Sequence, residues 1–284
     1  MAIQKKPSSG GELLFDTYGQ GIAGFSLRLL KSDYTGYCIK VRRSSDDTTQ
    51  DIGFVDGSLD IDSLLSFVGS GSGYVHTWYN QGSENANFVQ TTNTKQPRIV
   101  NSGNIEADGN KPCMRFLGGQ CLSAGNNFGN FPIQTNESYI YSIGVGSITN
   151  NYEVFYGKFD NIGGYDRRAI LTYDNKDQLN MYTQVVANNI KSTRAIHSFM
   201  TYNDGINTTV TNNYYYRDGV VMNNAIGFGY TSNLNFLIGA GSLNGGGEFW
   251  YMNGICQELI VNKTNTAPPL SDIHTDINSF YGIY

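Results

Sequence analysis

The stretch of sequence that decides the fold lies in the first third of the chain and begins Phe25-Ser-Leu-Arg-Leu-Leu30. Short apolar and aromatic runs alternate there with Gly, Asn and Ser, which is the pattern of brief strands separated by tight turns. The segments that follow are Tyr34-Thr-Gly36, Ile39-Lys-Val-Arg-Arg-Ser-Ser-Asp46, Gln50-Asp-Ile-Gly-Phe54, Thr77-Trp-Tyr-Asn-Gln81 and Gln96-Pro-Arg-Ile-Val-Asn101. This arrangement predicts an all-β fold.

Composition supports the same fold class. The chain has 284 residues with 34 Gly and 20 Tyr, and only 15% of its residues are charged. Many Gly and Asn turns between short aromatic and β-branched runs are typical of a β-sandwich. A chain of this length buries a substantial core, and no internal repeat or clear linker divides it. We therefore predict one sandwich domain over residues 21–284.

Residues 1–20 are polar and rich in Gly, and we predict an arm rather than part of the core. Two interpretations remain open for this arm. It is either a disordered tail or a segment for attachment or oligomerisation that docks onto a larger assembly.

Two helices are expected inside the β-rich pattern. The first has apolar residues at i, i+3, i+4 and i+7, with Asp60 as N-cap and Gly69 as C-terminal stop; its apolar face is Ile61, Leu64, Leu65 and Val68. The second follows Pro268-Pro269, with Ser271 as a candidate N-cap; its apolar stripe is Leu270, Ile273, Ile277, Phe280 and Tyr281. Residues 80–95 are expected to form a surface loop.

Strand candidates cover most of the remaining chain. They are residues 25–30, 37–43, 74–79, 113–117, 138–146, 153–156, 168–173, 178–183, 196–202, 207–217, 234–240 and 249–261.

Charge and hydropathy argue against two classes of partner. The net charge of -5 argues against nucleic acid, which is bound by neutralising phosphates. The basic cluster is Lys40, Arg42 and Arg43, and its alternation predicts that Lys40 and Arg42 line a solvated strand face. No apolar run approaches the ~20 residues of a membrane span, and the first residues do not resemble a secretory signal.

No cofactor and no metal site are expected. The histidines His76, His197 and His274 are far apart in the sequence and form no ligand cluster. The cysteines fit neither a zinc site nor a redox motif; they are Cys38, Cys113, Cys121 and Cys256. Cys113 and Cys121 could bridge a hairpin, but free thiols are favoured in a chain without a secretory signal.

The opening string resembles the catalytic domain of fungal-type α-L-arabinofuranosidase B, glycoside hydrolase family 54. The same opening is found in tailed-bacteriophage proteins that carry concanavalin A-like domains. The ending, Phe249-Trp-Tyr-Met-Asn-Gly254 and then Ile255–Asn262 before the last helix, is similar to the end of laminin-G-like sandwiches. The resemblance covers residues 25–284. It implies a concanavalin A-like jelly-roll sandwich with one short helix near the N-terminal third and one at the C-terminus.

The resemblance also indicates where a glycosidase site would lie. Retaining glycosidases need two carboxylates about 5–5.5 Å apart. Tyr156-Gly-Lys-Phe-Asp160 resembles the family's nucleophile segment, which makes Asp160 the one catalytic candidate. Ser242 falls near the position of the family's acid, and Ser cannot protonate a glycosidic oxygen. The adjacent cysteines that precede the nucleophile in the family are also absent, so we expect no arabinofuranosidase activity.

Other carboxylates and one amide could serve either a catalytic or a structural role. Glu153, Asp166, Glu248 and Glu258 are carboxylates that a hydrolase could recruit instead. Glu258 lies within an apolar strand, and a hydrogen-bonded core carboxylate is the favoured interpretation. Asn80 replaces an Asp of the family signature, and we expect it to stabilise its loop.

Exposed aromatic rings beside amides are the usual means of binding a sugar without cleaving it. Tyr214, Tyr215 and Tyr216 cannot all face the core of one strand. The carbohydrate-binding candidates are Trp78, Tyr165, Tyr215, Tyr230 and Trp250. Each of these residues could equally be a core or interface aromatic.

The favoured hypothesis is a structural virion protein of a tailed bacteriophage, made in the host cytoplasm. As a fibre, tail or capsid-decoration subunit it would bind host or mucosal glycans, and the arm would contact other virion proteins. The resemblance implies a homo-oligomer, often a trimer in fibres. The alternatives are a glycan hydrolase, with Asp160 as one carboxylate, and a stand-alone bacterial carbohydrate-binding module.

Overall fold

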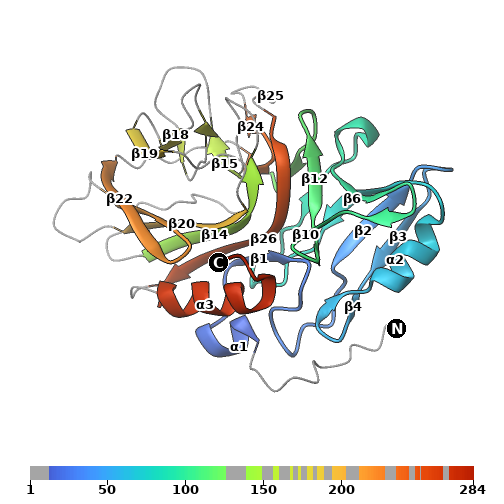
Figure 1. The fold of residues 1–284 in the computed structure, drawn as a ribbon, viewed down its shortest axis with the longest axis horizontal. Helices are drawn as coiled ribbons and strands as arrows, with labels where there is room; N and C mark the ends of the chain where they lie inside the picture. The colour runs from blue at the N-terminus through green and yellow to red at the C-terminus, as the bar shows by residue number, and fades with distance from the viewer. Residues whose placement is uncertain are drawn as a thin grey trace.

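The computed structural model describes most of the N-terminal half and the strands of the C-terminal half. The described residues are 13–125, 139–148, 156–159, 167–168, 172–173, 178–181, 184–188, 194–202, 211–227, 235–242, 247–249, 251–264 and 269–284. They form an all-β sandwich with three α-helices on its outside (Figure 1). The fold class predicted from the sequence is therefore confirmed. No helix in this part of the chain is long and apolar enough to cross a membrane.

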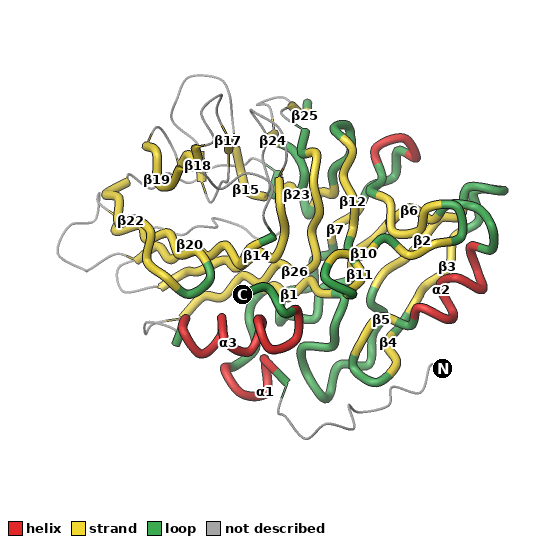
Figure 2. The backbone as a smooth tube through the Cα atoms, in the orientation of Figure 1, coloured by secondary structure: helices red, strands yellow, loops and turns green. Residues whose placement is uncertain are grey.

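The sheet is organised around β26 (Asn253–Thr264), a long strand with neighbours on both edges. It pairs with β14 (Tyr139–Ile148) on one edge and with β1 (Ala23–Ser26) and β12 (Met114–Leu117) on the other. Beyond β14 the order is β20 (Ala195–Tyr202), β21 (Thr211–Arg217) and β22 (Val220–Gly227). Beyond β12 it is β8 (Arg98–Asn101), β6 (Gly73–Trp78), β2 (Ile39–Arg43) and β3 (Thr49–Ile52). Figure 2 shows this row running from β22 and β20 at the left, through β14 and β26 in the middle, to β2 and β3 at the right.

A second row of short strands starts from β6. The antiparallel order is β7 (Phe88–Val89), β13 (Leu122–Ser123), β23 (Leu237–Ile238), β15 (Tyr156–Phe159) and β16 (Arg167–Arg168). The remaining elements are β4 (Phe54–Val55), β5 (Ser58–Leu59), β9 (Asn104–Ile105), β10 (Ala107–Asp108), β11 (Lys111–Pro112), β17 (Thr172–Tyr173), β18 (Gln178–Met181), β19 (Gln184–Asn188), β24 (Gly241–Ser242), β25 (Glu248–Phe249) and a 3₁₀ turn at Asn93–Lys95. The expected loop at 80–95 thus contains β7 and this turn.

The main hydrophobic core is aromatic. Phe25, Trp78 and Phe88 are each 0% exposed, and the ring centroids of Phe25 and Phe88 lie 4.5 Å apart in an edge-on arrangement. Such aromatic pairs stabilise a core beyond the area they bury. The main core is therefore built in part by the N-terminal third of the chain, where these three residues lie.

The predicted helix after Asp60 is confirmed as α2 (Ile61–Val68). The Asp60 side chain accepts a hydrogen bond from the Ser63 amide, which satisfies one of the free donors at a helix start. The helix ends at Gly69, whose φ of 65° favours glycine. Leu64 and Val68 are buried against the sheet.

The last helix is α3 (Leu270–Tyr281), and its predicted apolar stripe is buried except for Phe280, which is half-buried. The predicted N-cap is wrong, because Pro269 occupies that position and no side chain caps the helix. Proline suits a helix start, since its missing N–H would be unpaired there anyway. Ser271 instead lies in the first turn.

The predicted boundary of the N-terminal arm also differs from the structure. Residues 14–18 form helix α1 (Leu14–Tyr18), and Leu14 and Phe15 are buried in a second core beneath α3. The Phe15 ring lies so close to Gly24 that a Cβ at this position would overlap the ring. An apolar Leu-Leu-Phe run thus belongs to the domain, although polar and Gly-rich residues flank it. Residues 1–12 lie outside the described part of the chain.

The four cysteines are free and buried, as favoured from the sequence. Burial raises the pKa of Cys113 and Cys121 to about 12. These thiols therefore stay protonated and act as small core side chains.

A buried histidine fastens α3 to the sheet. His274 is 0% exposed, and its Nε2 shares a hydrogen bond with the Ser198 hydroxyl of β20. Its Nδ1 has no partner among the described residues. Burial lowers the pKa of His274 to about 4, so the imidazole is neutral near pH 7.

We expect this histidine to make the fold less stable in acid. The unfolded chain binds the proton near pH 6.5 and the folded chain only near pH 4, so stability is lost as the pH falls between these values. The linkage amounts to about 3 kcal/mol by pH 4. Urea unfolding at pH 7 and pH 4 measures it. His274→Gln should show a clearly smaller loss, and an equal loss in both proteins would contradict the assignment.

Candidate functional site

The segments that the glycosidase resemblance singles out meet at one corner of the sandwich. β15 and β24 are in contact, and β24 pairs with β25 so that Ser242 lies opposite Glu248. Phe159, the last residue of β15, directly precedes Asp160. Asp160 itself lies outside the described residues, as do Glu153 and Asp166. The assignment of Asp160 therefore stays a prediction, and the contacts of this region that can be described are those of Glu248.

Glu248 is a partnered carboxylate. The Lys95 ammonium donates to its Oε2 at 2.7 Å, and the Tyr251 hydroxyl lies 3.4 Å from the same oxygen. The Cys121 thiol lies 3.9 Å from Oε1. The hydrogen bond to Glu248 raises the pKa of Lys95, so the ammonium stays charged at neutral pH. The Glu248 carboxylate is therefore held in an ion pair with Lys95 rather than left free to contact a ligand.

Glu258 is the hydrogen-bonded core carboxylate expected from the sequence. It is 0% exposed and accepts hydrogen bonds from Arg28 Nε at 2.9 Å, Ser26 Oγ at 2.7 Å and the Tyr281 hydroxyl at 3.2 Å. Every partner belongs to β1, the segment after it, or α3. No substrate can reach this group, so its role is structural.

Asn80 stabilises its loop, as predicted. Its Oδ1 accepts from the amides of Gly24 and Gly82, each at 2.7 Å, and its Nδ2 donates to the Glu84 carbonyl at 2.7 Å. One amide thus joins Gly24 to two points of its own loop, and this requires both a donor and an acceptor.

The structure contradicts one of the predicted sugar-binding assignments and does not test the others. Trp78 is 0% exposed within the main core, so it presents no face to a ligand, and its assignment was wrong. Tyr215 lies in β21, but its side chain is not described. Tyr165, Tyr230 and Trp250 lie outside the described residues and stay predictions.

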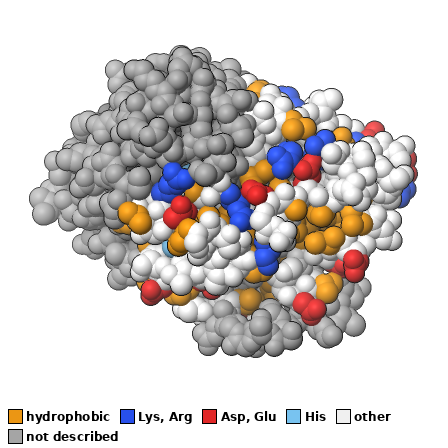
Figure 3. Space-filling view, viewed as in Figure 1, with side chains coloured by type: hydrophobic (Ala, Val, Ile, Leu, Met, Phe, Trp, Pro, Cys, Tyr) orange, Lys and Arg blue, Asp and Glu red, His pale blue; other side chains and the backbone are white. Residues whose placement is uncertain are grey.

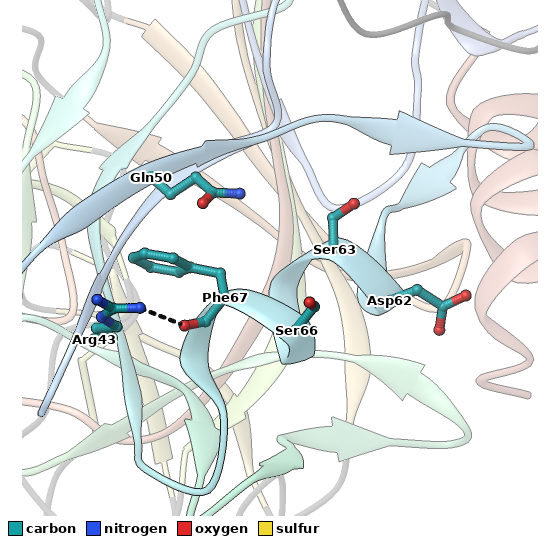
Figure 4. Close-up of a pocket in the computed structure, with 6 residues that line it drawn as sticks. All are labelled: Arg43, Gln50, Asp62, Ser63, Ser66 and Phe67. Carbon is teal, nitrogen blue, oxygen red and sulfur yellow. Dashed lines mark hydrogen bonds between the residues drawn. The ribbon is translucent and has the colours of Figure 1, made fainter.

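An open pocket of about 560 Å³ lies between the β2–β3 hairpin and helix α2. Six residues line it: Arg43, Gln50, Asp62, Ser63, Ser66 and Phe67. Figure 4 shows the Phe67 ring between the Gln50 and Arg43 side chains, with the helix residues beside it. Its volume falls in the range of small-ligand sites, about 300–1,000 Å³. Its lining is mostly polar.

No sequence pattern pointed directly to this pocket, because its residues are spread over two strands and a helix. The basic cluster was the nearest signal, and its interpretation needs correction. Arg42 is only 8% exposed, because its guanidinium donates to Gln96 Oε1 at 2.7 Å and lies over the Tyr74 ring. Arg43 faces the opposite way, into the pocket, because successive strand residues alternate in direction.

No metal-binding group of three or more His, Cys, Asp or Glu residues occurs in the described ranges. The face drawn in Figure 3 carries acidic, basic and apolar side chains, and neither sign of charge dominates its described part.

No family model and no curated protein sequence matches the chain. Solved structures do match its fold. An arabinofuranosidase complexed with arabinofuranosyl-α-1,2-xylobiose aligns with a TM-score of 0.68 and 13% identity, over 93% of this chain and 64% of the other. A family 54 α-L-arabinofuranosidase soaked with a cyclic sulfate inhibitor aligns with a TM-score of 0.67 and 14% identity, with the same coverage.

These similarities show the fold of the chain. At 13–14% identity the side chains of a site are not carried over with the backbone. The chain spans 64% of the length of these enzymes. It therefore has an arabinofuranosidase-like sandwich, and its activity has to be argued from its own residues.

Proposed function

We propose that this chain binds glycans without cleaving them. The observation that carries the proposal is the alignment of 93% of the chain with an arabinofuranosidase structure. The two positions that resemble the family's catalytic carboxylates are changed in this chain. Ser242 stands near the family's acid position, and the described carboxylate opposite it, Glu248, is paired with Lys95. A sandwich with the fold of a glycan-processing protein but without its proton donor could still bind a glycan, although it could not cleave one efficiently.

We expect the purified chain to bind at least one polysaccharide of a panel that includes arabinoxylan, and to release no reducing sugar from it. Losing a general acid costs about 10²–10⁴-fold in rate, so turnover should be at or near the background level. Binding is measured by calorimetry and cleavage by reducing-end assay. Rapid cleavage that disappears in Asp160→Asn would contradict the proposal, whereas unchanged slow release in that variant would remove Asp160 from any mechanism.

A hydrolase remains the second candidate, and one observation favours it. β15, whose last residue directly precedes Asp160 in the sequence, lies beside β24, the strand that pairs Ser242 with Glu248. If Glu248 replaced the missing acid, Lys95→Met would release its carboxylate from the ion pair. Cleavage that rises in Lys95→Met and vanishes in Glu248→Gln would establish this alternative. Neither change should matter for a protein that only binds.

We further propose that the chain is a virion protein of a tailed bacteriophage, as a fibre, tail or capsid-decoration subunit and as a homo-oligomer. The support is the resemblance of the opening string to phage proteins with concanavalin A-like domains. Because α1 belongs to the domain, residues 1–12 are the segment proposed to contact other virion proteins. Truncation of 1–12 should prevent incorporation into particles. Normal incorporation, or a stable monomer by light scattering, would instead favour the stand-alone binding module.

A further inference from the structure

The pocket beside α2 is separate from the corner that resembles a glycosidase site. Arg43 and Gln50 come from β2 and β3, and the other lining residues come from α2. Figure 1 shows α2, β2 and β3 at one end of the molecule, away from β24 and β25. A ligand in this pocket would therefore not occupy the place of the family's substrate.

The arginine of the pocket is held in a fixed position. Arg43 Nε and Nη2 donate to the two Asp46 carboxylate oxygens at 2.8 and 2.7 Å, and Nη1 donates to the Phe67 carbonyl at 3.2 Å. The guanidinium carbon lies 5.1 Å from the centre of the Phe67 ring. A guanidinium has five N–H groups, so two remain for a ligand. A donor that is already fixed loses little freedom when a ligand binds.

The helical wall of the pocket is fixed as well. The Asp60 side chain accepts from both the amide and the hydroxyl of Ser63, at 2.9 and 2.7 Å. This holds the first turn of α2, and the Ser63 oxygen keeps lone pairs that can accept a hydrogen bond. Ser66 is exposed one turn further along the same helix. The pocket thus presents hydroxyl, amide and guanidinium groups from elements that do not need to rearrange.

The charge of the pocket selects among polar ligands. Arg43 and Asp62 are the charged members of the lining. Asp46 neutralises Arg43, whereas Asp62 has no ion-pair partner within the described residues. The remaining charge is negative, so an anionic ligand would be repelled. Hydrogen-bond donors and acceptors beside an aromatic ring match a ligand that carries many neutral hydroxyl groups.

We propose that the pocket lined by Arg43, Gln50, Asp62, Ser63, Ser66 and Phe67 binds one or two units of a neutral saccharide. This proposal rests on the proposed glycan-binding function and assigns it a site. Arg43 and Gln50 bind ring hydroxyls from one side, and the serines of α2 bind them from the other. Asp62 excludes sugars that carry a carboxylate.

The test uses the full chain and an immobilised panel. The neutral probes are arabinoxylan, galactan and mannan, and the acidic probes are polygalacturonate and polysialic acid. Ser66→Trp fills the pocket from an exposed helical position, and we expect it to weaken binding of the best neutral probe at least about tenfold, equivalent to about 1.4 kcal/mol. Ser279→Trp on α3 is the matched control, because Ser279 is also an exposed helical serine. It should bind like the native chain.

A second variant tests the charge argument. Asp62→Asn keeps the size of the side chain and removes its charge, and we expect affinity for polygalacturonate to rise about threefold or more relative to affinity for the best neutral probe. Thermal melting shows that each variant is folded.

The outcomes separate the site from the function. If the native chain binds a neutral probe and Ser66→Trp binds it equally well, the pocket is not the site, although the proposed function stands. Preference of the native chain for the acidic probes would overturn the assignment to neutral sugars. If the native chain binds none of the probes, both the site and the proposed function fail.

Discussion

Replacing Arg28 by methionine should lower the free energy of unfolding by about 3–5 kcal/mol, the usual cost of leaving a buried charge without its partner. Glu258 is 0% exposed, and Arg28 is its cationic partner, with Nε at 2.9 Å from Oε2 and Nη2 at 3.3 Å from Oε1. Methionine has a similar length but no charge. Urea unfolding, followed by circular dichroism, measures the loss.

The effect should be large because Arg28 joins three parts of the fold. Besides Glu258 on β26, its Nη1 lies 2.9 Å from Asp276 of α3. The Tyr281 hydroxyl of α3 donates to Glu258 as well, and burial together with the nearby carboxylate raises the pKa of Tyr281 so that it stays protonated. Without Arg28 the remaining neutral donors cannot balance the Glu258 charge.

Two further variants test this explanation. Arg28→Met combined with Glu258→Leu removes both charges of the pair and should regain most of the lost stability, because an apolar pair of similar volume is often as stable as a buried ion pair. Lys31→Met, which breaks the exposed contact between Lys31 and Asp33, should cost less than about 1 kcal/mol. A double variant as unstable as Arg28→Met would show that the charge of Glu258 is not the cause.

Local signals in the sequence were sufficient to predict the helix after Asp60. The N-cap, the apolar spacing and the terminal glycine all lie within ten consecutive residues, so no distant contact was needed to recognise them. The start of the N-terminal core was missed for the opposite reason. Leu14 and Phe15 stand among polar residues, and only the approach of Gly24 and α3 gives them a place to be buried.

The candidate sites depend on distant residues and were harder to predict. The resemblance identified the segments around Asp160 and Ser242, but the pairing of Glu248 with Lys95 joins residues 153 positions apart. The pocket beside α2 likewise brings together two strands and a helix. Neither periodicity nor composition carries information about such contacts, because both describe neighbours along the chain.

The error at Trp78 has a specific cause. Alternation along β6 directs Gly73, Val75 and Thr77 inward, which predicts that Trp78 points outward. The pairing with β2 shifts register, from Val41 opposite Val75 to Lys40 opposite Thr77, so that one strand residue is skipped. Such a bulge changes which face the following residues occupy. Trp78 is thereby turned into the core, opposite Ile39.

Trp78→Ala should therefore cost about 3–5 kcal/mol of unfolding free energy, the usual result of emptying a large core position. Trp78 is 0% exposed and its ring centroid lies 5.7 Å from that of Phe25, so alanine would leave a cavity that these rigid strands cannot close. Trp78→Phe should cost less than about 1.5 kcal/mol, because it also removes the indole N–H, which has no partner in the described structure.

The comparison of these two variants distinguishes a core residue from a sugar-binding residue. Denaturant unfolding gives the stabilities, and the same proteins are then tested on the polysaccharide panel. We expect Trp78→Phe to bind the best neutral probe as the native chain does, because the buried indole is separate from the pocket beside α2. A Trp78→Phe protein that keeps its stability but loses glycan binding would mean that the indole contacts the sugar, and the core position would then be wrong. A Trp78→Ala protein with native stability would lead to the same conclusion, since a residue that contributes nothing to the core must be exposed.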